Sequence, residues 1–170
     1  MSSSPDAPTG PTSGTGHPDL EHAVVEHAVT VEDSMMVAHS LPGEVFGPAQ
    51  ALHGATYVVR ATFCRDALDG DGIVVDIGAA AAQLGEVLSD LTYTNLDDHP
   101  ELTGVVTTTE VLASFVARRL LGRAAAGLLR GRGDDLTALR VELGENPRAA
   151  AAVTVRLREP RPGATGWPWA

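Results

Sequence analysis

The sequence has no lysine, so arginine supplies all of its basic side chains. It also has a single cysteine and no long apolar run, and these two features exclude classes of structure. Cys64 alone cannot form a disulfide within the chain, which suits a reducing compartment. No stretch approaches the roughly 18 unbroken apolar residues that a membrane-spanning helix needs. The formal net charge of -10 argues against a nucleic-acid or anionic-membrane surface, because such binding depends on clustered basic residues. We therefore expect neither nucleic acid nor membrane as a partner.

The organisation along the chain follows from its composition. At 170 residues with 44% hydrophobic content, the chain is long enough for one domain with a core, which we place at residues 19–158. Residues 1–18 are rich in Ser, Thr, Pro and Gly and predict a disordered tail, and residues 159–170 predict a second tail. The start has neither the basic region nor the apolar run of a secretory signal, so we expect a cytoplasmic location.

Three segments in the first half have strand character. Residues 22–41 are apolar and β-rich, with charged residues at Glu32 and Asp33, which predicts a strand pair with its turn at those two residues. Residues 55–64, ATYVVRATFC, predict a further strand, since β-branched and aromatic residues are enriched there. LDGDG predicts a turn, after which residues 73–75 are expected to resume the sheet.

The second half predicts two helices and a closing strand pair. Asp76 is a candidate N-cap for a helix in IGAAAAQLGEVLSDL, and a second helix is expected from Thr107 or Thr108 to about residue 129. The segments LTALRVELGE and AAAVTVRLRE indicate an antiparallel pair. This order predicts an α+β domain with the helices packed on one face of an antiparallel sheet.

The motifs AHSL, HGATYVV, GIVVDIG, LDDHPEL, TTTEVLA and VELGEN occur in this order over roughly residues 22–157. In order and spacing they resemble the family of 6-pyruvoyltetrahydropterin synthase and 6-carboxytetrahydropterin synthase. The resemblance implies the tunnelling fold, in which a four-stranded antiparallel sheet with two helices on one face assembles into a barrel. It also implies a small, pterin-like substrate and a homo-oligomer, either a hexamer or a smaller ring.

The resemblance implies a zinc site held by three histidines, of which this chain has two. His39 matches the first ligand and His53 the second, while Ala55 takes the place of the third. Alternate strand positions share a face, so His53 and Ala55 are expected to point the same way and to leave a gap beside the metal position. Three outcomes are open: a carboxylate such as Glu44 completes the zinc sphere, a neighbouring subunit or small ligand does, or the site holds no metal.

The resemblance also implies a catalytic base, and here too the chain departs from the family. No cysteine stands a few residues before His53, and Gln50 occupies the position where some members have a glutamate. Glutamine cannot exchange a proton as a carboxylate does, so we expect Gln50 to contact substrate instead. Cys64 lies at odd spacing from His53 and is expected to be a buried core thiol. LDDHPEL keeps an aspartate-histidine pair, Asp98 and His99, which we expect to transfer protons; the alternative is a polar turn.

VELGEN matches the strand whose glutamate anchors the pterin in the family. We assign this role to Glu145, with Glu142 as the alternative if the register differs, because a carboxylate can accept two parallel hydrogen bonds from the pterin amide and amino groups. Thr108 and Glu110 are further candidates for substrate contact. Thr107 to Glu110 also fits a capping box, in which the glutamate serves the helix start.

Three functions remain in view. The first is a divergent enzyme, a lyase, cyclase or isomerase acting on a pterin or other small polar substrate in a specialised pathway, with Asp98 and His99 transferring protons. The second is a noncatalytic binding or assembly protein of the same fold. The third is an orthodox 6-pyruvoyl- or 6-carboxytetrahydropterin synthase, which would need other groups in place of the missing ones.

Overall fold

The computed structural model describes residues 26–129 and 135–157. The elements in chain order are β1 (His27–His39), η2 (Glu44–Gln50), β2 (His53–Arg65), α1 (Ile77–Ser89), η3 (Leu96–Asp98), α2 (Thr109–Ala125), β3 (Ala138–Asn146) and β4 (Ala149–Arg156). The tails expected at residues 1–18 and 159–170 lie outside the described residues.

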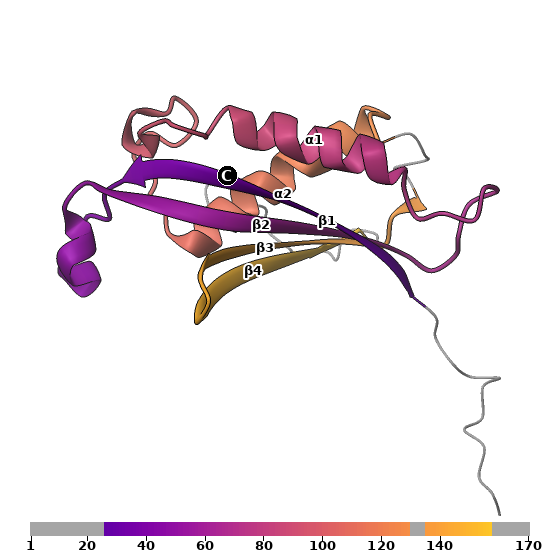
Figure 1. Ribbon diagram of the computed structural model, residues 1–170, viewed down its shortest axis with the longest axis horizontal. Helices are drawn as coiled ribbons and strands as arrows, with labels where there is room; N and C mark the ends of the chain where they lie inside the picture. Colours follow the sequence, from indigo (N-terminus) through magenta and orange to yellow (C-terminus); the bar gives the residue numbers. More distant parts are fainter. Residues whose placement is uncertain (1–25, 130–134, 158–170) are drawn as a thin grey trace, which may run out of the picture.

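The four strands form one antiparallel sheet in the order β1-β2-β3-β4 (Figure 1). Side chains of a strand alternate between faces, so Val59, Ala61 and Phe63 of β2 all point to one side, where they are fully buried. Both long helices lie on that side in Figure 1, α1 against β1 and α2 against β3 and β4. The predicted arrangement, two helices on one face of a four-stranded antiparallel sheet, is confirmed.

Two predictions for the first half are wrong. Residues 27–39 form one continuous strand instead of a pair, with no turn at Glu32 and Asp33. Glu32 instead forms a 2.7 Å ion pair with Arg60 of β2 on the face that the helices leave uncovered, so its charge needs no turn to reach solvent. Residues 73–75 do not return to the sheet: Val74 and Val75 are buried in the loop that leads into α1.

The helix starts follow local hydrogen bonding. Asp76 caps α1 as predicted, its carboxylate accepting a bond of 2.9 Å from the Ala79 N–H. Thr108 caps α2 and accepts a bond from the Val111 N–H. The predicted capping box is wrong, because a cap at Thr108 puts Val111 in the third helical position and Glu110 in the second. Glu110 is therefore not needed by the cap and is exposed to solvent.

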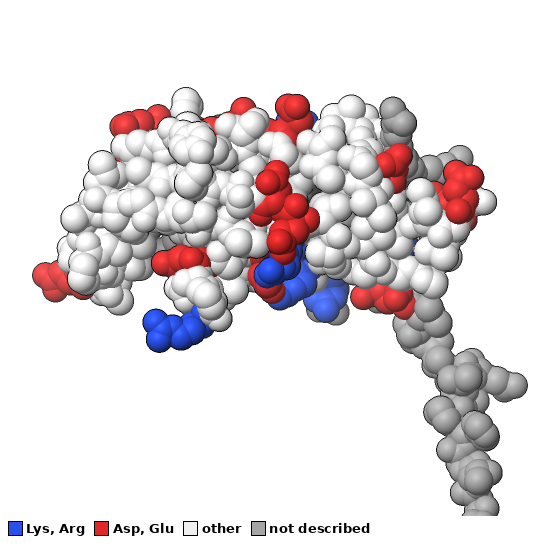
Figure 2. All heavy atoms as spheres, in the orientation of Figure 1, with Lys and Arg blue, Asp and Glu red and all other residues white. Residues whose placement is uncertain are grey.

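The uncovered face of the sheet carries a row of charges. Arg60 pairs with Glu32 on one side and with Glu142 on the other, and Arg140 also pairs with Glu142. Figure 2 shows acidic groups distributed over the visible face, with basic groups beside acidic ones at the sheet. In the part of the chain that the structure describes, no helix has the length and apolar character needed to span a membrane.

Candidate functional site

His39 and His53 lie side by side at one end of the sheet. They are paired across β1 and β2, on the face that the helices cover, and their ring centroids are 4.7 Å apart with a tilt of 46°. His39 is almost fully buried, with 2% of its surface exposed, whereas His53 is half-buried. The register of β1 and β2 therefore brings together the two imidazoles that the resemblance implied as zinc ligands.

Hydrogen bonds fix the same tautomer in both rings. His39 Nδ1 lies 3.1 Å from the carbonyl oxygen of Thr107 and 3.0 Å from its hydroxyl, and His53 Nδ1 lies 3.0 Å from the carbonyl oxygen of Ala51. A carbonyl oxygen only accepts, so each Nδ1 must carry the hydrogen and donate it. In the neutral rings, Nε2 then presents a lone pair, and neither Nε2 has a partner among the described residues.

The neutral form of His39 is favoured by its surroundings. Burial lowers the pKa of His39 and the neighbouring His53 lowers it further, which outweighs the Thr107 carbonyl and the carboxylates of Asp97 and Glu145. His39 therefore stays an uncharged hydrogen-bond acceptor at Nε2 around neutral pH.

A carboxylate reaches the same region from β3. The β3-β4 register shifts between Gly144 and Asn146, so Glu145 is the extra residue of a bulge, a feature that re-aims a side chain. Glu145 and Glu110 line a small hollow of about 130 Å³ with Thr109. Glu142, the alternative assignment, points to the uncovered face and is paired with arginines. The geometry thus favours Glu145 over Glu142.

Tyr57 joins the histidines to this carboxylate. Its ring packs edge-on against His39 at 6.5 Å and 84°, and only 2% of its surface is exposed. Burial raises the pKa of Tyr57, with the Glu145 and Glu110 carboxylates acting in the same direction and the Thr109 side chain opposing them. His39, Tyr57 and Glu145 therefore form one polar region at the start of α2.

The predicted proton-transfer pair is not assembled within one chain. The Asp98 carboxylate accepts a bond of 2.8 Å from the Asn95 side chain, whereas His99 Nδ1 accepts from the Glu101 N–H at 3.3 Å. His99 instead packs edge-on against Phe115 of α2, 5.9 Å between ring centroids. Within the described ranges, no hydrogen bond or ring contact joins His99 to Asp98, His39 or His53, so the expectation that Asp98 orients His99 fails in the single chain.

Asp97, the carboxylate next to Asp98, holds the end of β1 in place. Asp97 accepts bonds from the Ser40 N–H at 3.0 and 3.1 Å and from the Ser40 hydroxyl at 2.7 Å. These bonds fasten η3 to the residue after His39. Asp97 thereby helps to fix the end of β1 from which His39 projects.

Gln50 and Cys64 have local partners. The Gln50 amide donates to the Gly47 carbonyl at 3.0 Å within η2, so it supports its own turn. Cys64 is buried as predicted, and burial raises the pKa of its thiol, with Glu26 adding to the effect. A protonated, buried thiol is a poor nucleophile, so Cys64 does not replace the missing catalytic cysteine.

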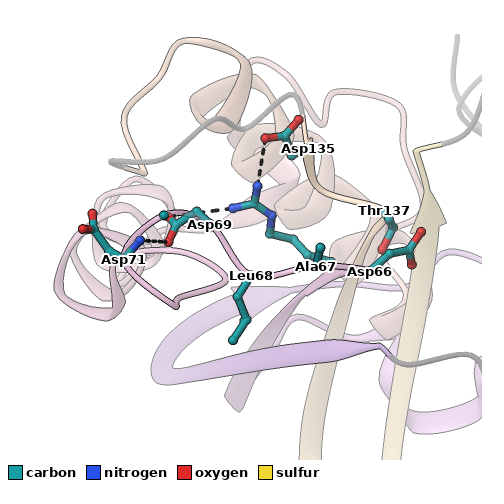
Figure 3. A pocket seen from close by; sticks show the side chains of 9 residues that line it. Asp66, Ala67, Leu68, Asp69, Asp71, Asp135 and Thr137 are labelled. Atoms are coloured by element: carbon teal, nitrogen blue, oxygen red, sulfur yellow. Dashed lines mark hydrogen bonds and ion pairs between the residues drawn. The ribbon is translucent and has the colours of Figure 1, made fainter.

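A second hollow lies at the other end of β2. It measures about 800 Å³ and surrounds Arg65, whose guanidinium bonds to Asp135 at 2.8 Å and lies 3.9 Å from Asp69 (Figure 3). Arg65 and His53 are the two ends of a 13-residue strand, roughly 40 Å apart at about 3.4 Å per residue. Among the described residues, the lining holds four aspartates beside Arg65, so the arginine is already neutralised and the hollow is acidic.

Comparison with known proteins identifies the family. The sequence model of the family described as 6-pyruvoyl tetrahydropterin synthase matches residues 28–156. The chain belongs to this family.

Solved structures of the 6-pyruvoyl tetrahydropterin synthase family share the fold. The synthase of Caenorhabditis elegans matches with a TM-score of 0.64 at 20% identity, over 78% of this chain and 97% of that one. The synthase of Plasmodium vivax matches with 0.62 at 17%, over 78% and 99%. An uncharacterized protein of Wolinella succinogenes matches with 0.54 at 16%, over 76% and 98%. No curated protein matches the chain.

The zinc site that the family implies does not fit the residues present. The two imidazoles are oriented as metal ligands are, each with its other ring nitrogen bonded to a carbonyl. The number of ligands is too small, however, because in residues 26–129 and 135–157 no three His, Cys, Asp or Glu side chains gather closely enough to hold a metal. Glu44 lies in η2 and does not complete such a set, and Ala55 offers only a methyl group.

The sequence did not predict that three further residues belong to this region. Tyr57 continues the alternation of His53 and Ala55 along β2, and that period of two was the signal for it. Thr107 was considered only as a possible cap, although its carbonyl holds His39. Asp97 was passed over for Asp98, and only the register of the η3 turn distinguishes the two.

Proposed function

We propose that this member of the 6-pyruvoyl tetrahydropterin synthase family is a divergent enzyme, a lyase, cyclase or isomerase acting on a pterin or another small polar substrate. The observation that carries the proposal is the gathering of His39, Tyr57 and Glu145 at the start of α2, on the helix-covered face of the sheet. The Nε2 acceptors of His39 and His53 on one side of this region and the Glu145 carboxylate on the other suit a flat ligand with several N–H and O–H donors.

Glu145 binds the ring of the substrate in this proposal. Its two oxygens accept two roughly parallel hydrogen bonds from an amide N–H and an adjacent amino group. Glu110, Thr108 and Thr109 border the same hollow or its approach at the start of α2. Gln50 contributes through the η2 turn that precedes His53.

Asp98 and His99 transfer protons in the proposal, but from a second copy of the chain. They have no contact with His39 or Glu145 in one chain, so a shared site requires a homo-oligomer. Glu145 also lines a hollow of about 690 Å³ with Glu142, whereas the hollow that it shares with Glu110 measures about 130 Å³ and needs further walls to reach the usual 300–1,000 Å³ of a small-molecule site. Because the described residues supply too few zinc ligands, the proposed chemistry uses the chain's own side chains.

The binding role of Glu145 is tested by titrating the assembled protein with neopterin in a calorimeter. Hydrogen bonds to a charged group contribute about 1.5–3 kcal/mol, so Glu145→Gln is expected to weaken binding roughly 10- to 100-fold. Glu142→Gln, on the uncovered face, is the matched control and is expected to leave the affinity within about twofold. Equal losses in both variants would contradict the assignment.

The catalytic role is tested by His99→Ala. We expect turnover of a bound pterin, followed by chromatography and mass analysis of products, to disappear while binding persists. Mixing His99→Ala chains with Glu145→Gln chains is expected to restore part of the turnover. At some interfaces of the mixed oligomer, the His99→Ala chain supplies an intact Glu145 and the Glu145→Gln chain supplies an intact His99. Turnover unchanged in His99→Ala would contradict the role of this residue.

A noncatalytic binding protein is the second candidate. It is favoured by the lack of a base near His53, where Gln50 is tied to its own turn and Ala55 carries no polar group. Tight pterin binding without any product would support this candidate over the enzyme.

A further inference from the structure

The Nε2 atoms of His39 and His53 are the polar atoms of the site whose role is not yet explained. Both Nδ1 atoms donate to backbone carbonyls, so both Nε2 atoms carry lone pairs and can only accept in the neutral rings. The rings are neighbours, 4.7 Å between centroids. The pair therefore offers two adjacent acceptors without a hydrogen of its own.

Such a pair can bind a metal, or it can accept hydrogen bonds from a ligand or from water. A zinc ion in a protein takes three or four protein ligands, and the described part of the chain gathers fewer than three. Ala55 stands two residues from His53 on the same strand face, about 7 Å along β2, and its methyl group cannot bind a metal. An uncharged organic ligand with hydrogen-bond donors can use the two acceptors without a third metal ligand.

We infer that His39 and His53 bind the hydroxyl groups of a polyol side chain directly, through two O–H···Nε2 hydrogen bonds, with no metal between them. The inference rests on the proposed function, since the ring bearing that side chain is the one held at Glu145. The ligand class is a planar heteroaromatic ring with adjacent hydroxyls on its substituent.

The closing experiment compares neopterin, which has a hydroxylated side chain, with pterin, which has none. Both are titrated into the full-length protein, once with EDTA and once with added zinc. Two net hydrogen bonds of about 1 kcal/mol each predict that neopterin binds roughly 10- to 30-fold more tightly than pterin. EDTA is expected to leave that ratio unchanged, and His53→Ala, which removes one of the two hydrogen bonds, is expected to lower it to roughly 3- to 6-fold without changing the affinity for pterin. His27→Ala, at the other end of β1, is the control.

A second variant, Ala55→His, tests whether the third histidine is what the chain lacks for binding zinc. Ala55→His is expected to retain about one zinc per chain after dialysis, while the wild-type protein retains less than about 0.1 and Ala55→Asn, of intermediate size, behaves like the wild type. Metal content measured on the folded oligomer gives this result without any activity assay. Stoichiometric zinc in the wild-type protein would overturn the inference.

The remaining outcomes separate the inference from the proposed function. A neopterin preference that EDTA removes, or equal affinities for neopterin and pterin, contradicts only the metal-free polyol site. Failure of both compounds to bind contradicts the proposed function, and this inference with it.

Discussion

His39 donates from Nδ1 to the carbonyl oxygen of Thr107, 68 residues further along the chain and immediately before the cap of α2. This bond ties the end of β1 to the start of the helix that also carries Thr109 and Glu110. It fixes both the tautomer and the orientation of His39, so the imidazole and the helix start are positioned by one another. The site therefore depends on the packing of α2 against the sheet as much as on its own residues.

The protonation of His39 predicts a pH dependence of stability. The folded-state pKa of His39 lies below the unperturbed value of 6.5, so the folded protein binds fewer protons than the unfolded chain between those two values. Its contribution to stability is complete above pH 6.5 and is lost as the pH falls through the folded pKa. We expect His39→Asn, which keeps an N–H toward Thr107 but does not titrate, to lose less stability between pH 7 and pH 5 than the wild type.

The measurement is urea unfolding at a series of pH values. His27→Asn controls for removal of a histidine elsewhere on β1. The same slope in the wild type and His39→Asn would show that another group causes the acid sensitivity. The charged groups around His39 that bear on its proton are Asp97, Glu145 and His53.

Thr108 and Glu110, two polar residues at the start of α2, are expected to differ in their effects on stability. Thr108 accepts the Val111 N–H, so Thr108→Ala is expected to cost about 1 kcal/mol of stability, the usual effect of losing a cap. Glu110 is exposed and outside the capping position, so Glu110→Gln is expected to cost less than about 0.5 kcal/mol while weakening pterin binding. Thermal unfolding and titration of the same samples distinguish the two; a large stability loss in Glu110→Gln would restore the capping-box interpretation.

The sequence predicted the layers of this fold because periodicity and cap chemistry are local. Asp76, the long α1 and α2 segments and the closing β3-β4 pair needed no information beyond their own neighbours. Glu32 and Asp33 misled for the same reason: two charges indicate a turn unless one knows that the strand is at an edge and that Arg60 lies opposite. Residues 73–75 have strand composition, but Val74 and Val75 are buried in the loop before α1 while Ile73 is exposed, which local composition does not predict.

The site was predicted less completely because it depends on contacts between distant segments. The resemblance implied that His39 and His53 lie together, but the bond from His39 to Thr107 spans half of the domain and leaves no local pattern. Asp98 and His99 are adjacent in sequence, yet a 3-10 turn sends their side chains to different partners. The bulge that carries Glu145 likewise has no clear signal in VELGEN.

Arg65 provides a test of the hollow that surrounds it. The residue is 5% exposed, and its guanidinium donates to the Asp135 carboxylate (Figure 3) and to the Val74 carbonyl. Removing one partner of a buried ion pair typically costs about 3–5 kcal/mol, and Asp135 is half exposed, so Arg65→Met is expected to lower stability by about 1–3 kcal/mol. Affinity for pterin is expected to stay the same, because this hollow lies at the far end of β2 from His53. A loss of affinity in a folded Arg65→Met protein would place the ligand in this hollow instead.

Asp97 and Asp98 are adjacent carboxylates, of which the sequence motif singled out only Asp98, as a proton-transfer residue. Asp97 holds the backbone and hydroxyl of Ser40 by three bonds, whereas the Asp98 carboxylate accepts a bond from the half-buried Asn95 side chain. We expect Asp97→Ala to cost about 1–2 kcal/mol in urea unfolding, since it removes several hydrogen bonds to a charged group at a solvent-exposed position, and Asp98→Ala less than about 0.5 kcal/mol.

Because Ser40 follows His39, Asp97→Ala should also weaken pterin binding. Asp98→Ala should leave binding intact and lower turnover, as expected of a group that acts on the substrate of a neighbouring copy. The reverse pattern, with binding lost in Asp98→Ala alone, would place Asp98 in the site of its own chain and contradict the shared arrangement.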